Sequence, residues 1–85
     1  NAEVDSDPVT WRRRVAKREE ERRARRQADL EDRIHDLEAR QADLQARLAV
    51  ASEAQDVARV RELGAEYSAI EQELNASLAE WAELG

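Results

Sequence analysis

Cysteine, methionine and phenylalanine are absent from this 85-residue chain, which has only one proline and two glycines. Without cysteine there is neither a disulfide framework nor a thiolate metal site. Aromatic residues make up 4% of the chain and charged residues 40%. This composition is unsuited to the compact core of an enzyme and is typical of extended, solvent-exposed helices.

Long apolar runs are also missing. No stretch approaches the roughly 20 apolar residues that a membrane-spanning helix needs. The first residues are polar and acidic, unlike a secretory signal peptide. We therefore expect a protein without membrane contact, and the lack of cysteine is compatible with a cytoplasmic location.

Two runs of mostly apolar residues dominate the second part of the chain, and both advance by alternating steps of three and four. Such spacing is typical of helices that bury one narrow seam against another helix. Gln41 interrupts the first run and Ser77 the second. The first run is Leu30, Ile34, Leu37, Gln41, Leu44 and Leu48, and the second is Val60, Leu63, Tyr67, Ile70, Leu74, Ser77, Trp81 and Leu84.

The break between the two runs, at about residues 51–56, is short enough to force the two helices antiparallel. We therefore predict an all-α fold, a monomeric two-helix antiparallel coiled-coil hairpin with an extended basic N-terminal helix. A turn near residue 55 pairs Leu44 with Tyr67, Gln41 with Ile70 and Leu37 with Leu74. Trp81 is expected to close the open end of the hairpin over Leu30.

The chain divides into three parts. Residues 1–10 contain Pro8 and no apolar periodicity, which predicts a disordered lead-in. Residues 11–28 form a basic helical segment or linker, and residues 29–85 form the hairpin. Thr10 is the expected N-cap of a helix that runs from Trp11 to about Val50.

The second helix is expected to begin at Asp56, with Ser52 as the alternative N-cap. Gly64 lies inside this helix. Its missing side chain either lets the two helices approach closely or is tolerated on the outer face.

The net charge of −6 hides a strong asymmetry. Residues 1–10 hold three acids, and residues 29–85 hold five arginines against fourteen acids, a net charge of −9. Residues 11–28 hold nine Arg or Lys residues against three glutamates, a net charge of +6. A basic block beside an acidic coiled coil indicates an interaction surface at one end of the molecule.

On a helix that turns about 100° per residue, part of the basic block forms one stripe roughly 80° wide. The stripe consists of Trp11, Arg14, Arg18, Arg22 and Arg25. One guanidinium group can bind two phosphate oxygens at once, and an indole can stack on an unpaired base. We therefore predict a nucleic-acid-binding surface without sequence specificity. Its candidate residues are Trp11, Arg12, Arg13, Arg14, Lys17, Arg18, Arg22, Arg23, Arg25 and Arg26.

No catalytic constellation is visible. His35, the only histidine, falls on an outward heptad position, and no nucleophile, metal-ligand spacing or glycine-rich phosphate loop is present. We therefore expect no enzymatic activity, cofactor or metal in this chain.

The hairpin resembles the C-terminal domain of the ABC-F ATPases, soluble proteins with two tandem ATP-binding cassettes. The resemblance covers about residues 25–85, although an Arg-rich run replaces the usual entry segment and Asp56-Val57 stands where Asp-Pro is common. The first helix matches an R-I-x-x-L-E pattern, and the second ends in the family's spaced E-L and W-x-x-L elements. The matching residues are Arg33, Ile34, Leu37, Glu38, Glu73, Leu74, Trp81 and Leu84.

This resemblance implies a parent that hydrolyses ATP with Mg²⁺, and many such proteins act on the ribosome. The hairpin would be an accessory arm that contacts ribosomal RNA, or DNA in some members. Two alternatives stay open for the basic segment. The first is a solvated helix, and the second is a surface that docks on a partner helix or on the parent's ATPase domains.

Overall fold

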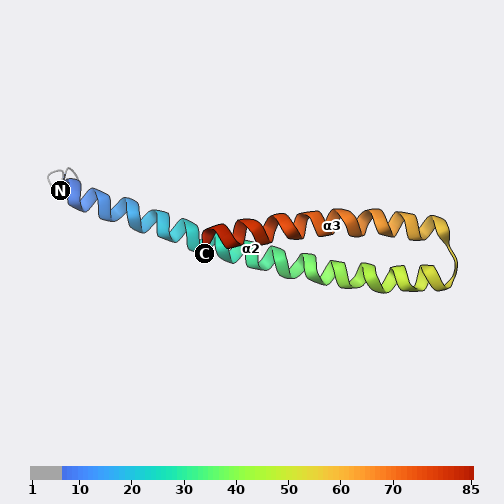
Figure 1. Cartoon of the computed structure of the whole chain (residues 1–85). Coiled ribbons are helices and arrows are strands. Elements are labelled where there is room, and N and C mark those ends of the chain that lie inside the picture. The colour runs from blue at the N-terminus through green and yellow to red at the C-terminus, as the bar shows by residue number, and fades with distance from the viewer. Residues whose placement is uncertain (1–6) are drawn as a thin grey trace.

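The computed structural model describes residues 7–85, which form two long helices joined by a three-residue turn (Figure 1). Helix α2 spans Pro8–Glu53, and helix α3 spans Val57–Leu84 and returns antiparallel along the second half of α2. No strand is present in this part of the chain. The predicted all-α, two-helix hairpin is confirmed.

Helix α2 begins three residues earlier than the sequence suggested. Asp7 is the N-cap, and its Oδ1 accepts a hydrogen bond of 2.9 Å from the Val9 backbone N–H. Pro8 occupies the first helical turn, where a missing N–H costs nothing and a fixed φ favours the helix. The prediction that Thr10 caps a helix starting at Trp11 was therefore wrong. Of the predicted disordered lead-in, residues 8–10 are helical and residues 1–6 lie outside the described part of the chain.

The buried residues follow the predicted seam. Leu37 and Leu63 are almost fully buried, and the remaining buried side chains are Leu30, Ile34, Leu44, Ala51, Ile70 and Leu74. Leu48, Val60 and Tyr67 pack against this cluster and are half-buried. The core of the described part of the chain is thus a single row of side-chain contacts along the line where the two helices meet.

A polar layer interrupts the seam at Tyr67. The Tyr67 hydroxyl accepts hydrogen bonds from the side-chain amides of Gln41, at 3.4 Å, and Gln45, at 3.2 Å. Gln41 therefore has a partner across the seam, as a half-buried amide requires. The layer also favours one register, because a shift of either helix would separate these groups.

The turn consists of Ala54, Gln55 and Asp56. The Asp56 N–H donates to the Ala51 carbonyl and the Gln55 N–H to the Ser52 carbonyl, both at 3.0 Å. Gln55 has a φ of 57°. This is a Schellman motif, in which the residue after the C-cap takes the left-handed conformation.

Asp56 is also the N-cap of α3, since its carboxylate accepts a hydrogen bond of 3.0 Å from the Arg59 N–H. The prediction of Asp56 as the N-cap is confirmed, and the alternative, Ser52, lies inside α2. The predicted end of the first helix near Val50 was early, because the last turn continues to Glu53.

The two remaining expectations concern Gly64 and Trp81. A Cβ atom built on Gly64 meets nothing within 4 Å, so this glycine does not mediate a close approach of the helices. Trp81 remains 38% exposed, and its indole N–H donates to Glu31 Oε1 at 3.1 Å. Leu30 is nevertheless only 4% exposed, so the open end of the hairpin is covered.

Candidate nucleic-acid interface

In the described part of the chain, most of the basic block lies on a stretch of α2 that α3 does not reach. Helix α3 ends beside the middle of α2, and the first half of α2 projects beyond it as a single helix (Figure 1). The described chain is therefore long and thin, with principal extents of 74 × 19 × 14 Å. We call residues 11–28 of α2 the basic arm.

The arm is helical because its residues have high helix propensity. It does not pack an apolar seam against another helix. Between Trp11 and Gln27 no residue is fully buried, and only Val15 and Gln27 are half-buried. Alanine, arginine, glutamate and glutamine, which dominate this segment, are good helix formers. The outer surface of the arm is consequently available around most of its circumference.

All ten predicted nucleic-acid-binding residues lie on this arm and are exposed. Trp11 is 59% exposed, near the free end of the arm. Arg14, Arg18, Arg22 and Arg25 follow it along one side of the helix, at spacings of three and four. The continuous helix therefore aligns the predicted stripe, with cationic groups bordering an exposed indole.

Arg26 has a second role in the structure. Its guanidinium forms an ion pair with the Glu80 carboxylate at 2.5 Å, with both side chains about half exposed. Arg26 thus ties the last turns of α3 to the base of the arm. Arg12, Arg13, Lys17 and Arg23 lie outside the stripe.

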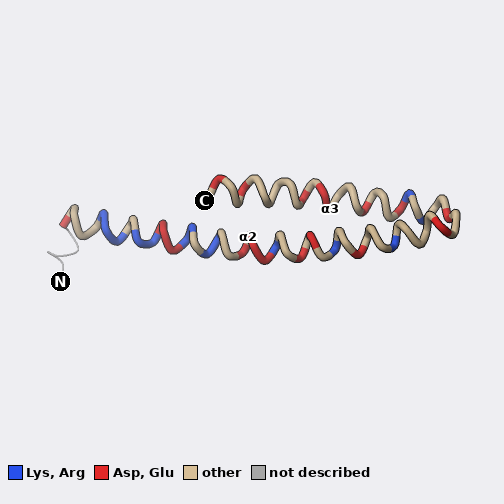
Figure 2. Tube along the Cα trace, turned by 60° about the horizontal axis from the view of Figure 1, so that its bottom comes forward, with Lys and Arg blue, Asp and Glu red and all other residues tan. Residues whose placement is uncertain are grey.

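The charge of the surface changes sign along the molecule. Blue bands of Lys and Arg crowd the free part of α2, and red bands of Asp and Glu prevail along the paired helices (Figure 2). Three of the five arginines of the hairpin, Arg47, Arg59 and Arg61, lie near the turn. The half of the hairpin next to the arm, residues 29–38 and 71–84, holds nine acids against one arginine. It is therefore the most acidic region and repels a phosphate backbone.

One side of the hairpin carries a ladder of facing charged positions, spaced by seven residues on each helix. Arg26 pairs with Glu80, and Arg33 pairs with Glu73 at 2.7 Å. One step further, Arg40 and Glu66 line the same surface hollow. The next step brings Arg47 opposite Arg59, where two arginines replace the Arg–Glu combination.

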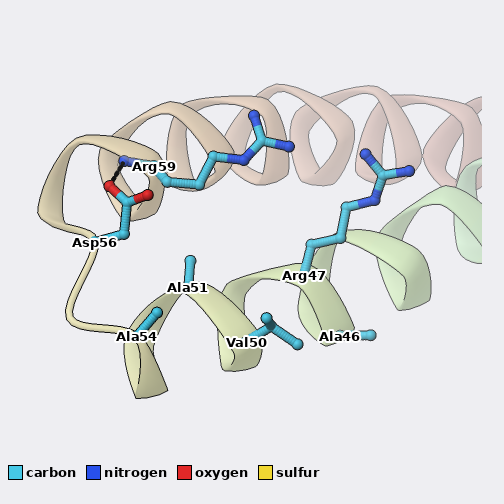
Figure 3. Close-up of a pocket in the computed structure, with 7 residues that line it drawn as sticks. All are labelled: Ala46, Arg47, Val50, Ala51, Ala54, Asp56 and Arg59. Atoms are coloured by element: carbon cyan, nitrogen blue, oxygen red, sulfur yellow. Dashed lines mark hydrogen bonds between the residues drawn. The ribbon is translucent and has the colours of Figure 1, made fainter.

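These two arginines border an open hollow of about 440 Å³ beside the turn, which we call the tip hollow (Figure 3). Its floor is apolar, because Val50, Ala51 and Ala54 contribute small or aliphatic side chains. In Figure 3 the Arg59 side chain extends along α3, and the Arg47 side chain rises from α2 toward α3. The hollow is lined by Ala46, Arg47, Val50, Ala51, Ala54, Asp56 and Arg59.

Sequence reasoning assigned no role to the tip hollow. The signal was present as glutamates at 80, 73 and 66 followed by arginine at 59, in steps of seven. It becomes visible only once the antiparallel register fixes which positions of α2 these residues face. The basic arm, by contrast, was evident from local charge density alone.

Other kinds of site find little support in the described residues. They hold no group of three or more His, Cys, Asp or Glu side chains that could bind a metal ion. The two glycines of the chain lie within α3 and at its C-cap, so the chain offers no glycine-rich loop for the phosphates of ATP. Within the part of the chain that the structure describes, neither helix is sufficiently apolar over a sufficient length to cross a membrane.

Comparisons with known proteins place the chain in one family. The family model described as the ABC transporter C-terminal domain matches residues 17–85, which include most of the basic arm and the whole hairpin. Searches of curated proteins and of solved structures found no match. Because the family match extends over most of the sequence, the chain belongs to the ABC transporter C-terminal domain family.

Proposed function

We propose that the chain is the accessory C-terminal arm of an ABC-F ATPase and binds nucleic acid, ribosomal RNA or DNA, through its basic arm. The observation that carries this proposal is the projection of a basic helix beyond the hairpin. Its stripe of arginines is exposed and is not covered by α3. The parent would supply ATP hydrolysis and would act in the cytoplasm.

The chemistry of the stripe suits a phosphate backbone. Each guanidinium presents a planar fork of N–H donors that matches two phosphate oxygens. Trp11 adds a flat apolar surface on which an unpaired base can stack. The arm contains no Asn, and its one Gln, Gln27, is at the hairpin junction, so reading of base edges is not expected.

The acidic hairpin restricts how nucleic acid can approach. A duplex lying along α3 would meet the carboxylates of the paired helices, whereas one that crosses the arm avoids them. Binding to the arm is therefore expected to hold the strand near Trp11 and Arg14 and to keep it clear of the acidic half of the hairpin. Affinity should fall steeply with salt, because each neutralised phosphate releases condensed counterions.

The direct test is fluorescence anisotropy of labelled single-stranded RNA, duplex RNA and duplex DNA, titrated with the chain at two salt concentrations. Replacing Arg14, Arg18, Arg22 and Arg25 by Glu should abolish binding and leave the hairpin folded. Circular dichroism of the variant would verify the fold. Unchanged affinity in this folded variant would refute the proposal.

A matched pair of variants distinguishes the contribution of the stripe to binding from the contribution of net charge. Arg18→Glu with Arg22→Glu changes two residues on the stripe, and Arg13→Glu with Arg23→Glu changes two residues outside it. Both variants alter the net charge equally. The stripe variant should bind at least several-fold more weakly than the other, and equal losses would indicate general electrostatic attraction instead.

Docking on a partner helix or on the parent's ATPase domains is the second candidate function. The same solitary helix supports it, because a lone arm can also pack against protein. The arm carries no apolar seam, however, so such a partner would have to be acidic. Failure of all three nucleic acids to bind at low salt would favour this reading.

A further inference from the structure

The tip hollow breaks the charge pattern of the hairpin. Along the ladder, each arginine of α2 faces a glutamate of α3 at positions 80, 73 and 66. At the tip, Arg47 faces Arg59, and both line one hollow. Two like charges in facing positions destabilise a hairpin, so this pair is a local cost to the fold.

The position of Arg59 within α3 adds to this cost. Asp56 is the N-cap and bonds the Arg59 N–H, which places Arg59 at the third residue of the helix. A cation near a helix N-terminus opposes the helix dipole. Glutamate at this position would instead interact favourably with the dipole of α3. Glutamate would thus suit both the ladder and the helix start better than Arg59 does.

The acidic partners of these arginines do not bridge the hollow. Arg47 pairs with Asp43 at 3.0 Å and Arg59 with Glu62 at 3.3 Å, in each case within one helix. Neither acid lines the hollow, and the arginine side chains remain 57% and 42% exposed. Two guanidinium groups therefore flank an apolar floor. Among the described residues that line the hollow, no other is basic, and the one acid, Asp56, already caps α3.

Arg59 violates two local rules, and its one ion pair, with Glu62, is exposed and lies within the same helix. Such a residue is expected at a functional site. We propose that the tip hollow binds a phosphate group of a nucleic acid strand, between Arg47 and Arg59, with the adjoining sugar against Val50 and Ala54. This inference rests on the proposed function and adds a second contact to it. The two contacts lie at opposite ends of the molecule, with the repulsive acidic region between them.

The test compares two charge reversals two residues apart. Arg59→Glu alters the tip hollow, and Arg61→Glu makes the same charge change on a residue that does not line it. Affinity is measured by anisotropy with the nucleic acid that the unaltered chain binds best, long enough to span the 74 Å of the molecule. Thermal unfolding of both variants is followed in parallel.

Arg59→Glu should weaken binding about tenfold, the effect of one charge-assisted contact. The plot of log affinity against log salt concentration has a negative slope, and its magnitude should decrease by about 0.7 to 0.9, the contribution of one phosphate contact. The melting temperature should rise, because the substitution extends the Arg–Glu ladder by one step and removes a cation from the N-terminus of α3. Arg61→Glu should change affinity much less. Equal losses in the two variants, or no loss in Arg59→Glu, would overturn the tip site.

The two proposals fail in different ways. If only the tip site is wrong, Arg59→Glu binds like Arg61→Glu while the variant with four arm arginines reversed does not bind. If only the arm is wrong, that arm variant keeps its affinity and Arg59→Glu loses it. Backbone amide NMR shifts during titration locate the contact independently, at residues 47–59 or at residues 11–28. Absence of binding by the unaltered chain overturns both.

Discussion

Replacing Gln55 by glycine should stabilise the hairpin. Gln55 follows the C-cap of α2 and has a φ of 57°, in the left-handed region. A side chain there brings Cβ close to the following carbonyl, at a cost of about 1–2 kcal/mol, which glycine does not incur. Glycine is for this reason the usual residue at this position of a Schellman motif.

Part of the gain is lost in the unfolded chain. Glycine has more conformational freedom than glutamine when unfolded, and ordering it costs about 0.4–1 kcal/mol more. The Gln55 side chain is exposed and forms no hydrogen bond within the motif, whose bonds are made by backbone groups. The net stabilisation should therefore be about 0.5–1 kcal/mol, or about 2–8 °C in melting temperature for a chain of this size.

The assay is thermal and denaturant unfolding followed by circular dichroism, with Gln55→Val as the control. Valine is β-branched and fits the left-handed region poorly, so Gln55→Val should destabilise the hairpin. A Gln55→Gly protein that melts at or below the temperature of the unaltered chain would refute the assignment of strain to this residue. The same conclusion would follow if glycine and valine had equal effects.

Three further predictions concern the helices themselves. Asp56→Ala should cost about 0.5–2 kcal/mol in denaturant unfolding, because the Arg59 N–H loses its acceptor, and a cost near zero would contradict the cap. Gly64→Ala should add about 1 kcal/mol in the same assay, since the new methyl group meets no atom and alanine is the better helix former; destabilisation would show hidden crowding. In hydrogen exchange, backbone amides of residues 12–25 should be far less protected than those of residues 34–48, because only the latter lie in a helix packed against another; equal protection would indicate an unseen partner.

The seam was predictable because heptad spacing alone determines which residues a helix pair buries. Leu37 and Leu63, at core positions of the two runs, are the two most deeply buried side chains. The start of α2 was misjudged because proline was read as a helix breaker. The pair Asp7-Pro8 is instead an N-cap followed by a first-turn proline, a recognised start signal.

The end of α2 carried no readable signal. Helices that finish in a Schellman motif usually show glycine after the C-cap, and Gln55 occupies that position here. The same limit applies to the tip hollow. Its two arginines are twelve positions apart in sequence, and only the turn geometry makes them neighbours of one surface. Features that depend on the conformation of one residue or on the register of the two helices therefore cannot be predicted from the spacing of apolar residues.

The distribution of charge explains why stability and function can be separated in this chain. The hairpin is stabilised by a seam of apolar contacts and by ion pairs such as Arg33–Glu73, which lie away from the outward stripe of the arm. Changes on that stripe should alter binding without unfolding the hairpin. Arg26 is the exception, because it belongs to the basic arm and also holds Glu80 at the end of α3. Its replacement should therefore affect both properties, and it marks the boundary between the part of the molecule that is proposed to bind and the part that folds.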